Sequence, residues 1–154
     1  MRPRSDRSAR ARSLSRKLAM QALYQWQLAG QSVAELRQQF ATEEDYAAAD
    51  EDYFSALVGG ITGSSDALDE RLQALVDRPL AQLDPVERAV LWIGVFELVQ
   101  RPDVPYRVVI NEGVELAKRF GATEGHKFVN AVLDRAARSL RAAEQAVASN
   151  GGRG

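Results

Sequence analysis

The most apolar stretch of the sequence covers residues 86–99 and contains only three charged side chains. Asp84 stands just before it as a candidate N-cap, Pro85 suits the first helical position, and Glu87 follows the cap by three residues, as in a capping box. A helix that is apolar on nearly all sides must be surrounded by protein, and this one is too short to span a bilayer. The pattern therefore predicts a buried central helix over residues 84–100.

Apolar residues at helical spacing predict further helices on both sides of this one. We expect a compact all-α domain over residues 10–142, with two helical halves, about 10–78 and 79–142, around the central buried helix. No segment alternates between apolar and polar residues as a strand would. Residues 1–9 are predicted to be a flexible basic arm, and residues 143–154 a disordered tail. The expected helices cover residues 9–29, 33–40, 53–76, 106–120, and 123 or 124 to about 142. The second of these helices follows a capping box at Ser32, and the third is expected to break near residue 63. Residues 42–52 are expected to form a solvated acidic loop.

Composition narrows the chemistry that the chain can carry out. In 154 residues, 45% are apolar, which is enough for a hydrophobic core. The sequence has no cysteine and one histidine, which excludes disulfides and thiolate ligands and leaves little for zinc or for a catalytic triad. The expectation is a protein without catalytic residues, cofactor or metal. No apolar run follows the basic N-terminus, so we expect a cytoplasmic protein with no membrane partner.

Charge is distributed unevenly along the chain. The first 17 residues carry seven basic side chains against one acidic side chain, which leaves 13 basic and 20 acidic residues in the remainder. An arginine-rich end is typical of proteins that bind a polyanion, most often nucleic acid. A solubilising tail is the alternative explanation. Four candidate phosphate contacts lie in the first turns of the first predicted helix: Arg10, Arg12, Arg16 and Lys17.

A second candidate site is the pair Lys127 and Phe128 at the start of the last long helix. An aromatic ring beside a cation can stack an unpaired base while the cation holds a phosphate. The alternative is that Phe128 only covers the core between helices. Tyr24 is similarly undecided between the core and a partner surface.

Four segments of the sequence carry a recognisable pattern: 16–24 (RKLAMQALY), 83–91 (LDPVERAVL), 103–112 (DVPYRVVINE) with 116–118 (LAK), and 126–134 (HKFVNAVLD). In this order they resemble the signature blocks of the NusB family of bacterial transcription antitermination factors. The last three blocks together are specific, and the resemblance extends from about residue 10 to residue 138.

The resemblance implies an all-α fold of two helical halves and a non-enzymatic role. Members of the family bind a single-stranded RNA element in the leader of ribosomal RNA operons together with the ribosomal protein NusE. The complex joins RNA polymerase and suppresses premature termination. Carried over to this sequence, the RNA-binding residues are Arg10, Arg12, Arg16, Lys17, Lys127 and Phe128, and the protein-partner residues are Tyr24, Glu87 and Arg88.

One position departs from the family, and two other functions compete with the first. Trp92 stands where the family commonly has arginine, so it is either buried or part of an altered partner or dimer surface. NusB-like domains also precede certain ribosomal RNA cytosine methyltransferases, but such an enzyme needs a downstream catalytic domain with cysteines, and this sequence ends at Gly154 without one. The other alternative is a homodimerisation module in which the basic arm is idle.

Overall fold

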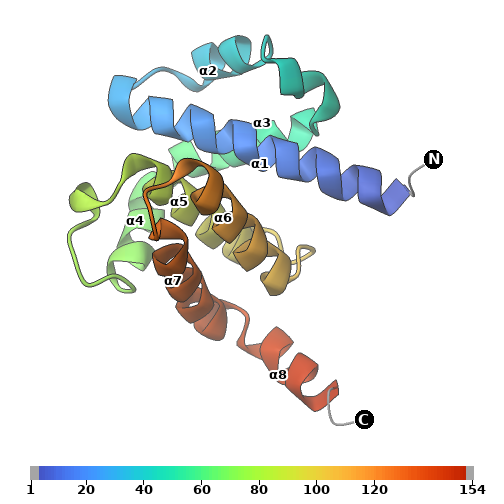
Figure 1. The fold of residues 1–154 in the computed structure, drawn as a ribbon, viewed down its shortest axis with the longest axis vertical. Coiled ribbons are helices and arrows are strands. Elements are labelled where there is room, and N and C mark those ends of the chain that lie inside the picture. The colour runs from blue at the N-terminus through green and yellow to red at the C-terminus, as the bar shows by residue number, and fades with distance from the viewer. Residues whose placement is uncertain (1–3, 152–154) are drawn as a thin grey trace. The chain divides into compact units, whose positions relative to one another are not determined.

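The computed structural model describes residues 4–151, in which every regular element is a helix (Figure 1). This confirms the all-α fold class. No helix in this range is long and apolar enough to cross a membrane. The elements are α1 (Arg4–Ala29), α2 (Val33–Phe40), the 3-10 helix η1 (Glu44–Ala48), α3 (Glu51–Gly63), α4 (Ser65–Gln73), the 3-10 helix η2 (Leu80–Gln82), α5 (Pro85–Gln100), α6 (Tyr106–Phe120), α7 (Gly125–Leu140) and α8 (Ala142–Gly151).

Both ends of the described chain are helical where irregular structure was expected. Helix α1 starts at Arg4, and α8 occupies much of the expected tail. Neither glycine nor proline occurs within α1, and its arginines and alanines favour a helix even where nothing packs against it. Residues 1–3 of the predicted arm and 152–154 of the predicted tail lie outside the described residues.

The chain divides into two compact units, residues 1–65 and residues 66–154. The predicted break near residue 63 is confirmed, because α3 ends at Gly63 and α4 begins at Ser65. The unit boundary lies earlier in the chain than residue 78. The reason is that α4 belongs with α5, since Asp69 of α4 accepts hydrogen bonds from two side chains of α5.

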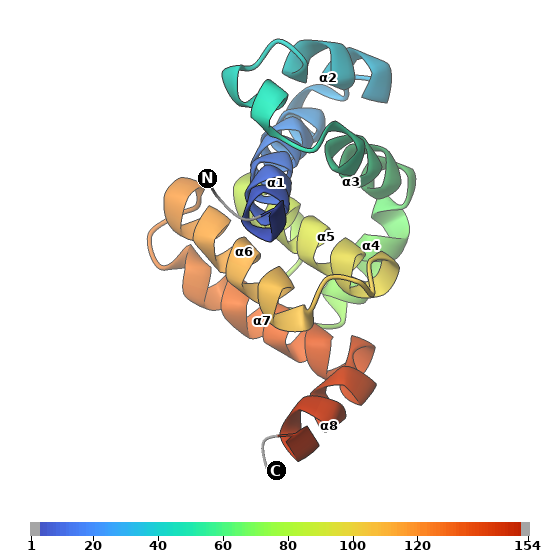
Figure 2. The ribbon, with the colours of Figure 1, turned by 90° about the vertical axis from the view of Figure 1, so that its right-hand side faces the viewer.

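In the first unit, α1 packs against α3 and η1, and α2 packs against both long helices (Figure 2). The ring of Phe54 lies 6.1 Å from that of Phe40 and 5.8 Å from that of Tyr46. The buried hydroxyl of Ser15 donates to the carbonyl of Asp50 at 2.6 Å and accepts from its N–H at 2.9 Å. Asp50 in turn caps α3, so the middle of α1 is tied to the start of α3.

In the second unit, α5 is buried on nearly all sides and packs against α6 and α7. Asp84 caps it by accepting from the N–H of Val86 at 2.7 Å, as predicted. Two glycines bring the helices close together. A Cβ on Gly94 of α5 would lie 2.5 Å from Leu133 Cδ2, and one on Gly113 of α6 would lie 2.8 Å from Leu133 Cδ1. The central buried helix is thus confirmed, and one leucine of α7 fills the space left by both glycines.

Candidate nucleic-acid and partner surfaces

The predicted phosphate contacts of α1 differ in how far solvent reaches them. Arg10 is exposed, and Arg12 is half-buried with its guanidinium carbon 4.5 Å from the centre of the Tyr53 ring. Arg16, one turn further along the helix, also lies over Tyr53, at 5.4 Å. Because Arg12 and Arg16 are four residues apart, they share one face of α1, and Tyr53 of α3 covers that face.

Two of these predicted phosphate contacts are engaged within the fold. Arg16 is only 2% exposed, so in this conformation its charge has no surface on which to meet a phosphate. Lys17 is half-buried and forms an ion pair with Asp45 of η1. The sequence places all four cations in one basic segment, but the fold uses Arg16 and Lys17 to attach α1 to α3 and η1. Arg10 and part of Arg12 remain on the surface.

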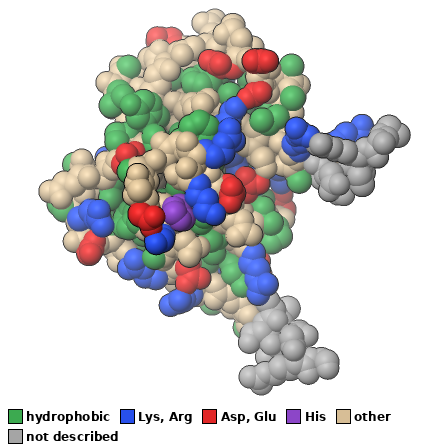
Figure 3. Space-filling model, in the orientation of Figure 1, with side chains coloured by type: hydrophobic (Ala, Val, Ile, Leu, Met, Phe, Trp, Pro, Cys, Tyr) green, Lys and Arg blue, Asp and Glu red, His purple; other side chains and the backbone are tan. Residues whose placement is uncertain are grey.

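Lys127 and Phe128 lie in the first turn of α7, after a backbone turn in which Glu124 adopts a left-handed conformation with a φ of 69°. The Lys127 side chain is 73% exposed, and its ammonium lies 2.5 Å from the Glu124 carboxylate. Figure 3 shows basic side chains on both sides of the single histidine, which directly precedes Lys127 in the sequence. An exposed pair of this kind contributes about 0–1 kcal/mol, so it would not prevent Lys127 from binding a phosphate.

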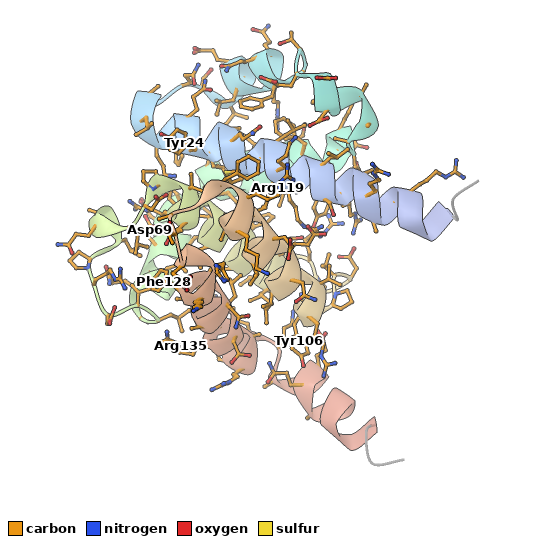
Figure 4. The ribbon with its side chains drawn as sticks, in the orientation of Figure 1. Tyr24, Asp69, Tyr106, Arg119, Phe128 and Arg135 are labelled. Atoms are coloured by element: carbon orange, nitrogen blue, oxygen red, sulfur yellow. The ribbon has the colours of Figure 1, made fainter. Side chains whose placement is uncertain are left out.

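Phe128 is half-buried at the same helix start (Figure 4). The guanidinium carbon of Arg78 lies 4.7 Å from the centre of its ring. Arg78 precedes η2 and is separated from Phe128 by 50 residues of sequence. This partner could not be predicted from the sequence, because Arg78 lies in a short irregular segment where no periodic pattern indicates which side chain it will contact.

Glu87, predicted to contact a protein partner, is buried at the start of α5. Its carboxylate accepts a hydrogen bond from the N–H of Ala122 at 3.4 Å. A Cβ on Gly125 would lie 2.7 Å from Glu87 Oε2, so the carboxylate packs directly on the backbone at the start of α7. Burial raises the pKa of Glu87 above its usual range, which the Ala122 hydrogen bond only partly offsets. In this conformation Glu87 joins α5 to α7, and it offers little surface to a partner.

Arg88 and Trp92 share one carboxylate on α4. Arg88 Nη2 donates to Asp69 Oδ2 at 2.8 Å, and the indole N–H of Trp92 donates to Asp69 Oδ1 at 2.8 Å. Trp92 is buried, which decides between the two interpretations of this position. Asp69 was not identified from the sequence, because nothing in the pattern of α4 distinguishes it from a solvated carboxylate.

The end of α1 exposes an apolar surface. Tyr24 is 39% exposed and Leu28 is 64% exposed. They are four residues apart and therefore neighbours on one face of the helix. This outcome favours the partner-surface interpretation of Tyr24 over the core interpretation.

Comparison with known proteins decides the family. The NusB family profile matches residues 13–138 of this chain. The chain belongs to the NusB family. The transcription antitermination protein NusB of Hahella chejuensis is 52% identical to it over 139 residues, which are 90% of this chain and 93% of that protein. The NusB protein of Alcanivorax borkumensis is 52% identical over 134 residues, which are 87% of this chain and 89% of that protein.

Solved structures of NusB proteins share the fold. The structure of T. maritima NusB has a TM-score of 0.73 and 28% identity, and the match covers 82% of this chain and 89% of that one. A chain from the crystal structure of the antitermination factors NusB and NusE in complex with dsRNA has a TM-score of 0.70 and 27% identity, with 84% and 98% covered. The resemblance to NusB is thus confirmed, and these relatives are named as antitermination factors and not as enzymes.

Proposed function

We propose that this chain is a transcription antitermination factor that binds RNA from the leader of ribosomal RNA operons together with the ribosomal protein NusE. The relatives named as antitermination proteins support this function, and so does the similar NusB chain solved with NusE and dsRNA. The complex would join RNA polymerase and suppress premature termination. Such a role places the protein in the cytoplasm, where transcription takes place.

The observation that carries the RNA-binding proposal is the start of α7. There an exposed cation, Lys127, directly precedes a half-buried aromatic ring, Phe128, that already lies under a guanidinium. Lys127 would bind a phosphate, and the Phe128 side of this site would bind a base by stacking, which contributes about 1–3 kcal/mol per base. Sequence would be read on unpaired bases, because the deep, narrow major groove of an A-form duplex hides its base edges.

The start of α1 would supply the remaining electrostatic attraction. Arg7 and Arg10 are exposed and Arg12 is half-buried, so with Lys127 about four cations could meet phosphates. For a single-stranded RNA, the logarithm of the affinity should then fall with the logarithm of salt concentration at a slope of about -3. Arg16 and Lys17 would act by holding α1 against its unit, and not through phosphate contacts.

A separate surface would bind the protein partner. Tyr24 and Leu28 form an exposed apolar pair on α1, whereas Glu87 is buried and Arg88 is half-buried and held by Asp69. We therefore assign the NusE contact to Tyr24 and its neighbour Leu28. A homodimer through this surface is the competing outcome, and sedimentation of the protein alone at increasing concentration distinguishes the two.

A binding titration tests the proposed function. Labelled operon-leader RNA, a scrambled strand of equal composition and a duplex of the leader sequence are each titrated with the protein, with and without NusE. We expect the leader strand to bind at least about tenfold more tightly than the scrambled strand when NusE is present, because hydrogen bonds to the edges of unpaired bases discriminate between sequences by about 1–3 kcal/mol each. Equal affinity for all three RNAs with and without NusE would reduce the proposal to general attraction for polyanions.

Matched variants locate the site. Lys127→Gln should weaken leader binding and make the salt slope shallower by about 0.7, because one phosphate contact is lost. Arg107→Gln is the control, since Arg107 is an exposed cation at the opposite end of α6 from the α6–α7 connection. Equal effects of the two substitutions would contradict a phosphate contact at Lys127.

A further inference from the structure

We propose that Arg78 is an RNA-binding residue, and that its guanidinium, supported from below by the Phe128 ring, is the platform on which an unpaired base stacks. This inference rests on the proposed function and assigns the base contact within it. In the unbound protein the guanidinium carbon is 4.7 Å from the ring centre, within the range of a cation–π interaction. A base approaching this ring therefore meets the guanidinium of Arg78.

The loop that carries Arg78 is held in place by one side chain. Gln73, the last residue of α4, donates from its amide nitrogen to the carbonyl of Arg78 at 2.9 Å. Its amide oxygen accepts from the N–H of Leu80 at 3.3 Å. Both ends of the Arg78–Pro79–Leu80 segment are thus bound to the end of α4. The backbone that carries the Arg78 side chain is therefore fixed by two hydrogen bonds, and this places the guanidinium over Phe128.

The charge of Arg78 is held only weakly by its neighbours, although it also acts at a distance on the carboxylate of Glu87. Among the residues that the structure describes, Arg78 forms an ion pair with its neighbour Asp77, at 3.4 Å between Nε and Oδ1, and the two side chains are 49% and 88% exposed. A pair so long and exposed contributes about 0–1 kcal/mol. Arg141 of the same unit is different, because it is buried and hydrogen-bonded to four backbone carbonyls. Arg78 can therefore change partners at little cost to stability.

The geometry suits a nucleobase better than a phosphate alone. A guanidinium is planar, is less strongly hydrated than an ammonium, and stacks on the faces of unpaired bases. With Phe128 beneath it, a base above it would complete a three-layer stack, and Lys127 one residue earlier could hold the adjoining phosphate. This arrangement explains why Phe128 is half-buried: its role is to support the guanidinium, and the base need not reach the ring.

The test uses Arg78→Lys, which keeps the charge and loses the stacking plane. Leader RNA carrying 2-aminopurine at single positions is titrated at several salt concentrations in the full chain with NusE. Arg78→Lys should weaken binding by about 5- to 150-fold, the range of one stacked base, and leave the salt slope unchanged. It should also restore the fluorescence of one 2-aminopurine that the unsubstituted protein quenches. Arg107→Lys is the control and should change neither readout.

Coupling to Phe128 distinguishes a stack from two separate contacts. Phe128→Leu should cause a loss similar to that of Arg78→Lys, and the double variant should lose no more than about twofold beyond either one, because both substitutions remove the same stack. Fully multiplicative losses would overturn the three-layer arrangement. The three-layer arrangement would also be overturned if Arg78→Ala bound RNA more tightly and quenched 2-aminopurine more strongly. In that case the guanidinium would cover the Phe128 ring, and the base would have to displace it.

The two proposals fail in distinguishable ways. If the unsubstituted protein with NusE binds leader and scrambled RNA alike, the proposed function fails and the assignment of Arg78 fails with it. If leader binding is selective and Lys127→Gln weakens it, but Arg78→Lys stays within about twofold of the unsubstituted protein, only the Arg78 inference fails. Because Arg78 is exposed, its variants should keep the thermal midpoint of the parent, which circular dichroism checks directly.

Discussion

Arg141, the residue that ends α7, is buried although it is charged. Its guanidinium reaches the end of α5 and the connection to α6, where the last carbonyls of a helix have fewer backbone donors than those in its interior. It also pairs with Glu144 Oε1 at 2.6 Å, and Glu144 accepts from the N–H of Tyr106 at the start of α6. The four carbonyls that accept from Arg141 are those of Glu97 at 3.2 Å, and of Leu98, Arg101 and Val104 at 2.9 Å each.

We predict that Arg141→Met lowers the free energy of unfolding by about 3–5 kcal/mol. Methionine retains much of the side-chain volume but donates no hydrogen bond, so the carbonyls of Leu98 and Val104 lose the donor that Arg141 supplies, whereas those of Glu97 and Arg101 keep a backbone donor. Each such group costs about 1–3 kcal/mol when left unpaired, and the losses overlap because the chain can relax. The side chain of Glu144 is 35% exposed, so the loss of its ion pair adds little to this cost. For a chain of this size the thermal midpoint should fall by on the order of 10 °C.

Urea denaturation followed by circular dichroism measures this loss. Arg138→Met is the matched control, because Arg138 lies one turn earlier on α7, is exposed, and pairs with Asp134 at 2.6 Å. An exposed pair at this spacing contributes about 0.3–0.5 kcal/mol. If Arg141→Met destabilises the protein no more than Arg138→Met does, the carbonyl network contributes nothing, and the reasoning from buried hydrogen bonds is refuted.

Three further substitutions test separate parts of the fold. Glu87→Gln should stabilise the protein at neutral pH, because burial raises the pKa of Glu87 and its ionised form is therefore disfavoured in the folded state. The gain in stability should disappear as the pH falls below 4.5, the ordinary pKa of a glutamate. Urea titrations in which the gain is the same at every pH would contradict this prediction. Gly94→Ala should lower the free energy of unfolding by about 1–3 kcal/mol, because its Cβ would overlap Leu133 Cδ2 at 2.5 Å. In a protein that already carries Leu133→Ala, Gly94→Ala should lower it by less. Ser15→Ala should cost about 1 kcal/mol in the same assay, because the buried hydroxyl is bonded to both backbone groups of Asp50, and no change would argue against that tie.

Helix positions could be predicted from the sequence where periodicity and caps agree. The bounds of α6 are those expected, residues 106–120, and α5 begins after Asp84 as its capping pattern predicts. The 3-10 helix η1 lies in the acidic stretch expected to be a loop. A single turn of this kind buries no apolar stripe of its own, so it produces no periodic signal.

Contacts between distant residues could not be predicted in the same way. The exposure of Lys127 follows from its place on α7, but Arg78 lies over Phe128 only because Gln73 fixes the intervening loop. Likewise, the spacing of the arginines and lysine in α1 does not indicate that Tyr53 covers Arg16. Periodicity indicates which face of a helix is buried, and tertiary packing decides which individual charges remain on the surface.

The salt dependence of RNA binding tests the central claim most directly. Affinity for the leader strand is measured from low to high salt for the unsubstituted protein, for Arg10→Gln and for Lys127→Gln, with Arg107→Gln as the control. We predict a slope of about -3 for the unsubstituted protein and for the control, and a slope shallower by about 0.7 for each of the two site variants. A slope near zero, or one that none of the substitutions changes, would contradict phosphate contacts at the start of α1 and at the start of α7.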